Sequence, residues 1–120
     1  MAICIPFLGV PNIEKTILWY QELGFSCTGS NRYWEPDAVL SWAQLEWEGA
    51  AFMLYNSEKD DTGETKDAGL YFKVHSFNGL IDKLKQYAKI IELTEQHSSP
   101  NQQVVFEDLN GYRITFSRDI

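Results

Sequence analysis

The side chains in this chain that could act as acids, bases or metal ligands are few and scattered. Its two histidines are His75, at the end of a predicted strand, and His97, in a polar loop. At such places a solvated or locally hydrogen-bonded imidazole is the more common case, and we favour it over metal ligation. Glu46, Glu48 and Glu107 lie in or near predicted strands. They could line a cavity, although an exposed strand face is the simpler interpretation.

The sequence contains no recognisable motif for nucleophilic catalysis or phosphate binding. We find no glycine-rich phosphate loop, no Ser-His-Asp arrangement and no activated-cysteine signature. Cys4 and Cys27 are too few for a disulfide scaffold and lack metal-site spacing, so we interpret them as reduced thiols. Cys4 could face a cavity, but an isolated cysteine usually packs in the core as a small hydrophobic residue.

The net charge of the chain argues against some classes of binding partner. The 120 residues are 44% hydrophobic and carry a net charge of −7, from 10 basic and 17 acidic side chains. This balance repels phosphate backbones and anionic lipids, so we expect neither nucleic acid nor membrane as a partner. The excess of acidic side chains favours a cationic ligand. Alternatively, this charge only keeps the protein soluble. No leader-like or membrane-spanning segment is recognisable, and we expect a cytoplasmic protein.

The elements that would position a site occur twice. A strand candidate over residues 2–8 precedes a helical pattern over 13–23, and a strand candidate over 69–74 precedes a helical pattern over 77–88. Asn12 and Ser76 occupy the same place in the two copies, where each would cap its helix. A duplication of this kind indicates two joined half-modules, with a site shared between them.

Each half continues with three further strand candidates. Tight turns are expected at Glu48-Gly49 and at residues 108–111, where Asn-Gly favours a hairpin. The expected strands are residues 38–47, 50–55, 90–95, 102–107 and 112–117, together with an extended stretch that begins at Phe25. The sequence thus predicts one α+β domain, with modules 1–56 and 69–120 joined by a charged linker over 57–68.

Four segments in this order resemble the vicinal oxygen chelate superfamily. They are residues 5–25 (IPFLGVPNIEKTILWYQELGF), 49–56 (GAAFMLYN), 69–74 (GLYFKV) and 106–116 (FEDLNGYRITF). That superfamily includes glyoxalase I, extradiol dioxygenases, fosfomycin-resistance enzymes and bleomycin-resistance proteins. The resemblance implies two βαβββ modules that form a curved mixed sheet around a cavity, with helices on the outer face, and a homodimer.

Metal-dependent members of that superfamily hold a divalent ion with His and Glu side chains. The resemblance places Ile5, Phe52 (or Met53 if the register slips by one), Gly69 and Thr115 at those positions. None of these side chains is a competent ligand, so we expect no metal and no other cofactor.

The same mapping gives a set of candidate ligand-binding residues and no catalytic residue. The set is Phe7, Trp42, Phe52, Tyr71, Arg113 and Thr115. Any single ring among them could instead belong to the core. Arg113 alternates with Tyr112 and Ile114, so it should face away from the core, where it could hold an anionic or carbonyl group.

The function favoured by this pattern is that of a bleomycin-resistance-like protein. It would sequester a small cationic or aromatic molecule in an aromatic-lined cavity without metal, and without catalysis. One alternative is a glyoxalase- or dioxygenase-type enzyme with a rearranged metal site. Another is a structural domain whose cavity is filled by its own aromatic rings.

Overall fold

The computed structural model describes residues 1–57, 66–94 and 101–119. The chain divides into two compact units, Met1–Thr62 and Gly63–Ile120. Most of the linker predicted at 57–68 therefore lies outside the described residues, as does His97.

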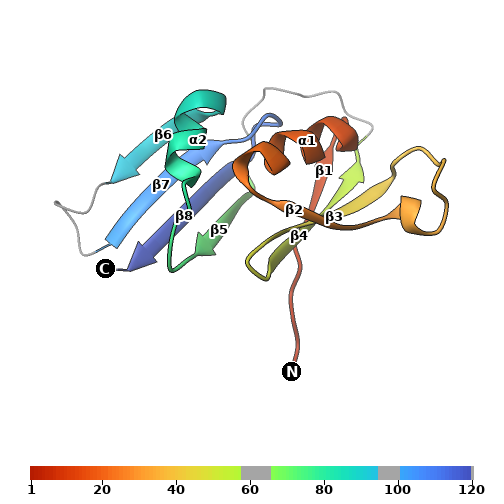
Figure 1. Ribbon diagram of the computed structural model, residues 1–120, viewed down its shortest axis with the longest axis horizontal. Coiled ribbons are helices and arrows are strands. Elements are labelled where there is room, and N and C mark those ends of the chain that lie inside the picture. Colours follow the sequence, from red (N-terminus) through yellow and green to blue (C-terminus); the bar gives the residue numbers. More distant parts are fainter. Residues whose placement is uncertain (58–65, 95–100, 120) are drawn as a thin grey trace. The chain divides into compact units, whose positions relative to one another are not determined.

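The first unit is a four-stranded sheet with one helix (Figure 1). Its elements are β1 (Phe7–Val10), α1 (Ile13–Leu23), β2 (Ser26–Ser30), β3 (Trp42–Trp47) and β4 (Ala50–Asn56), with a short 3-10 turn at Asn31–Tyr33. The strand order is β1-β4-β3-β2, in which β1 runs parallel to β4 and the other pairs are antiparallel.

The second unit repeats this topology. Its elements are β5 (Gly69–Lys73), α2 (Leu80–Tyr87), β6 (Lys89–Thr94), β7 (Asn101–Glu107) and β8 (Arg113–Asp119). The order is β5-β8-β7-β6, again with a parallel first pair. The α+β class and the two βαβββ modules are confirmed.

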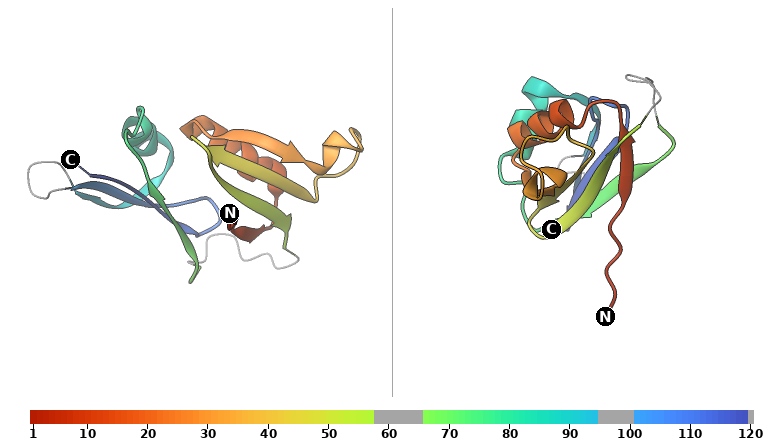
Figure 2. Two further views of the ribbon diagram at one scale, coloured as in Figure 1. Left: turned by 90° about the horizontal axis from the view of Figure 1, so that it is seen from below. Right: turned by 90° about the vertical axis from the view of Figure 1, so that its right-hand side faces the viewer.

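In each unit the helix covers one face of its own sheet (Figure 2). Alternation along the strands produces this asymmetry, because neighbouring side chains point to opposite faces. In β3, Ala43, Leu45 and Trp47 are buried, whereas the residues between them are half-buried. In the first core Tyr20 meets Phe25 and Phe52 edge-on. The second core stacks Phe72 on Phe116, with ring centroids 4.7 Å apart.

The two helix starts differ although the sequence copies match. Asn12 caps α1 as predicted, since its Oδ1 accepts a hydrogen bond from the Lys15 amide at 2.9 Å. Ser76 does not cap α2, which begins only at Leu80. The Ser76 hydroxyl instead accepts from the Asn78 amide at 3.1 Å, and Asn78 and Gly79 both take positive φ angles. This local turn replaces the first helical turn expected from residue 77.

Strand β1 is shorter than predicted, because it begins at Phe7 rather than at residue 2. Pro6 has no amide hydrogen to donate, so the parallel ladder with β4 ends at the Pro6 carbonyl, which accepts from the Met53 amide at 2.8 Å. The preceding residues, among them Cys4, are exposed. The expectation that Cys4 packs in the core is therefore wrong.

The predicted turn at Glu48-Gly49 is confirmed, with φ angles of 47° and 89° that suit a tight hairpin. Neither helix of the described residues, at 11 and 8 residues, is long and apolar enough to cross a membrane.

Candidate functional site

Each sheet has a face that its own helix does not cover, and register assigns the residues of both faces. The first open face comprises Phe7, Gly9, Trp42, Gln44, Glu46, Ala51, Met53 and Tyr55. The second open face comprises Gly69, Tyr71, Lys73, Gln103, Val105, Glu107, Arg113, Thr115 and Ser117.

A row of five aromatic rings, here called the aromatic strip, extends from the first open face onto the loop before β3. Its members are Phe7, Tyr55, Trp42, Trp34 and Tyr33. The Phe7 and Tyr55 rings meet edge-on at 5.1 Å, and Tyr55 lies in register with Trp42. Trp42 and Trp34 are 6.5 Å apart between centroids, and Trp34 and Tyr33 are 5.4 Å apart. The strip therefore consists of two groups of contacting rings, Phe7 with Tyr55 and Trp42 with Trp34 and Tyr33, on strands that are in register.

These rings remain largely accessible. Phe7 is 53% exposed, Tyr55 45%, Trp34 72% and Tyr33 82%, while Trp42 is half-buried. Large apolar side chains gathered in this way on a surface are typical of a binding site. Glu46 lies on the same open face and is half-buried, and no basic side chain belongs to that face.

Two glycines position rings of the strip. A Cβ on Gly9 would lie 2.9 Å from the Tyr55 ring, and one on Gly29 would lie 3.1 Å from the Trp42 ring. Each ring therefore lies against bare backbone, which a larger residue would prevent. Asn31 fixes the loop above, because its Oδ1 accepts from the Ser41 amide at 2.9 Å and its amide group donates to the Val39 carbonyl at 2.9 Å.

The position expected for Phe52 requires a correction. Its side chain is 1% exposed and faces the helix, where it contacts Tyr20 and Phe25. Met53 is in register with Phe7 and takes the open-face position instead. The register thus slips by one residue, which is the alternative noted for this strand.

The second open face brings together the other three predicted residues. Tyr71 is 60% exposed and lies in register with Thr115, which is half-buried. Arg113 is exposed, as its alternation with Tyr112 and Ile114 predicted, and is in register with Gly69. Their ligand-binding role stays a prediction.

At Gly69 the backbone of the neighbouring strand leaves no room for a side chain. A Cβ at this residue would lie 2.5 Å from the Arg113 carbonyl oxygen of the neighbouring strand. The residue at the third expected metal position is therefore glycine because β5 approaches β8 closely. A histidine or glutamate there would need the two strands to separate.

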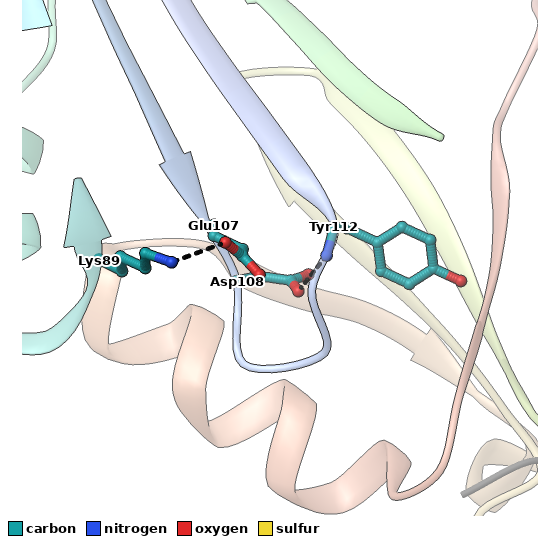
Figure 3. Close-up of polar contacts among 4 residues, drawn as sticks. All are labelled: Lys89, Glu107, Asp108 and Tyr112. Carbon is teal, nitrogen blue, oxygen red and sulfur yellow. Dashed lines mark hydrogen bonds and ion pairs between the residues drawn. The ribbon is translucent and has the colours of Figure 1, made fainter. Parts of the chain in front are cut away.

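Carboxylates near the β7–β8 turn have structural partners (Figure 3). The Glu107 carboxylate lies 3.6 Å from the Lys89 ammonium group, with the Glu107 side chain 11% exposed. The buried Asp108 carboxylate accepts from the backbone amides of Asn110 and Tyr112, at 2.8 and 3.0 Å. These contacts, with Gly111 at a φ of 89°, build the hairpin predicted at residues 108–111.

The described residues contain no group of three or more His, Cys, Asp or Glu side chains that could hold a metal ion. Of the expected metal positions, Ile5 is half-buried ahead of β1, and Met53, Gly69 and Thr115 lie on the open faces. His75 is exposed beyond the end of β5. The absence of a metal from the protein stays a prediction.

Several solved structures have a fold similar to that of this chain. Similar structures are TioX from Micromonospora sp. ML1 (15% identity, covering 99% of this chain and 97% of that chain, TM-score 0.76) and a bleomycin-binding protein complexed with bleomycin (12% identity, 100% of both chains, TM-score 0.72). The fosfomycin resistance protein FosX from Listeria monocytogenes has 11% identity, covers 100% of this chain and 94% of that chain, and gives a TM-score of 0.73.

The chain has the vicinal oxygen chelate fold. No family model matches the sequence, and the curated proteins contain no significant match. At these identities the vicinal oxygen chelate likeness concerns the fold alone, and the site must be argued from this chain's own residues.

Tyr55, Tyr33 and Asn31 were not predicted from the sequence to belong to a candidate site. Tyr55 could have been found from strand alternation, because it stands two residues after Met53. Asn31 and Tyr33 lie in a loop whose path no periodic pattern predicts.

Proposed function

We propose that this protein binds a flat aromatic cation on the aromatic strip and sequesters it without a metal ion. The observation that carries the proposal is the strip itself, five mostly exposed rings in two contacting groups. Aromatic faces stack on planar ligands and attract cations, at about 1–3 kcal/mol for each stacked ring system.

Charge supports a cationic ligand over a neutral one. Glu46 lies on the first open face, and the protein carries a net charge of −7. A cation is attracted by this field before it contacts the rings, whereas an anion of the same shape is repelled. On the second open face we propose that Tyr71, Arg113 and Thr115 bind a carbonyl or anionic group of a ligand.

The comparisons make sequestration a reasonable role for this fold. One similar structure is a bleomycin-binding protein in complex with bleomycin, and another is a fosfomycin resistance protein. A metal-dependent enzyme is the second candidate, but the residues at the expected ligand positions do not favour it. The single-domain organisation, the homodimer and the cytoplasmic location stay predictions.

Isothermal titration calorimetry tests the proposal. The ligands are bleomycin, the planar cation proflavine and, as an anionic counterpart, naphthalene-2,6-disulfonate. We expect saturable binding of at least one cation and none of the disulfonate. Failure of both cations to bind would contradict the proposal.

A pair of tyrosine variants locates the binding. Tyr55→Leu removes a central ring of the strip and should weaken cation binding by about tenfold or more, as loss of one stacking partner predicts. Tyr87→Leu is the matched control, because Tyr87 is 52% exposed on α2, outside the strip. Equal loss in both variants would show that the strip is not the binding surface.

A further inference from the structure

Ser117 is buried although it belongs to an open face. It is 1% exposed, whereas the other residues of the second open face are exposed or half-buried. Among the described residues its hydroxyl oxygen has no hydrogen-bond partner. A buried hydroxyl without a partner costs about 1–3 kcal/mol, so a ligand that supplies its hydrogen bond would recover that free energy.

Ser117 lines a hollow of about 280 Å³ together with Lys73, Val74 and His75. The backbone fixes this arrangement, because Lys73 is in register with Ser117 and the Val74 amide donates to the Ser117 carbonyl at 2.9 Å. His75 follows directly in the turn after β5. The volume is several times the roughly 30 Å³ that one water occupies in the liquid, so the hollow has room for a small ligand.

Three of the four residues that line the hollow, Lys73, Ser117 and His75, carry a side chain that can donate a hydrogen bond. Lys73 provides an ammonium group, Ser117 a hydroxyl, and His75 at least one ring N–H in either protonation state. Three donors carried by a strand, a neighbouring strand and a turn would suit a ligand with several acceptor oxygens. Hydrogen bonds from charged donors to anionic oxygens are stronger than neutral ones.

We propose that this hollow is a binding site for a small tetrahedral oxyanion of the phosphate class. The site lies within the second unit, does not involve the aromatic strip, and stands or falls independently of the proposed function. Its attraction for an anion is local, since the chain as a whole is acidic.

The test is a proton NMR titration of the full chain with sodium phosphate, in which the ring signals of His75 are followed. Titration with sodium chloride at matched ionic strength and with sodium acetate gives the controls, and His75→Gln assigns the signals. We expect a saturable shift with phosphate and none with chloride. The proposal is overturned if phosphate acts only as chloride does, or if acetate binds more tightly than phosphate.

Three variants separate the site from a general charge effect. Ser117→Ala should fold at least as stably as the parent, because it removes an unpartnered hydroxyl, and should weaken phosphate binding about tenfold or more. Lys73→Gln should weaken it as well. Lys83→Gln is the matched control, since Lys83 is an exposed lysine on α2 outside the hollow. Unchanged phosphate affinity in a folded Ser117→Ala protein would refute the assignment.

Discussion

The close approach of β5 to β8 at Gly69 leads to a quantitative prediction for Gly69→Ala. The added Cβ would lie 2.5 Å from the Arg113 carbonyl oxygen, whereas ordinary contact begins at 3.4 Å. The strands would have to separate by about 0.9 Å at this pair. The oxygen belongs to the backbone and cannot rotate away, so relief must come from the five-pair parallel ladder between the two strands.

Two opposing terms set the size of the effect. Overpacking of this kind costs about 2–3 kcal/mol, while replacement of glycine by alanine recovers about 0.4–1 kcal/mol by restricting the unfolded chain. Gly69 has no positive φ, so conformational strain adds nothing. We therefore expect Gly69→Ala to lower the free energy of unfolding by about 1–2.5 kcal/mol.

Urea denaturation followed by far-ultraviolet circular dichroism measures this change. Gly9→Ala is the matched control, because its Cβ would meet only the Tyr55 ring, a side chain that can move. That control should change stability by less than about 0.5 kcal/mol but displace a ring of the aromatic strip and weaken cation binding. A Gly69→Ala protein as stable as the parent would refute the close approach, and with it the argument that position 69 cannot hold a metal ligand.

Other predictions concern capping, the β7–β8 turn and metal. Asn12→Ala should lower the free energy of unfolding by about 1 kcal/mol, because the Lys15 amide loses its acceptor. Thermal unfolding measures this change, and an unchanged Tm would contradict the capping role. Asp108→Ala should cost about 2–3 kcal/mol in urea denaturation, because two buried amides, those of Asn110 and Tyr112, lose a charged acceptor. Prolonged dialysis against EDTA should leave cation affinity unchanged in calorimetry, and a loss that Zn²⁺ or Mn²⁺ restores would favour the metal-dependent alternative.

Strand alternation made much of the fold and of the second open face predictable. The assignment of Arg113 to an exposed position required only that Tyr112 and Ile114 be buried. In β4, however, residues 50–55 (AAFMLY) are apolar throughout. Such a run does not reveal which face is buried, so the choice between Phe52 and Met53 depended on packing against α1.

The start of α2 was predicted wrongly because a local turn replaces the first turn of the helix. Ser76 occupies the place of the Asn12 cap, but Asn78 and Gly79 accept positive φ angles and allow a turn before the helix. The aromatic strip was only partly foreseen for a different reason. Its arrangement depends on the loop held by Asn31 and on the Tyr55 ring lying over Gly9, and neither tertiary contact follows from a periodic sequence pattern.

Heteronuclear NMR of the four tryptophan indole N–H groups gives the most direct test of cation binding on the aromatic strip. Trp34 and Trp42 belong to the strip, whereas Trp47 is buried in the core and Trp19 lies on α1. On titration with proflavine or bleomycin, we expect saturable shifts of the Trp34 and Trp42 signals and little change at Trp19 and Trp47. Saturable shifts confined to Trp19 or Trp47, or no shift at all, would contradict binding on the aromatic strip.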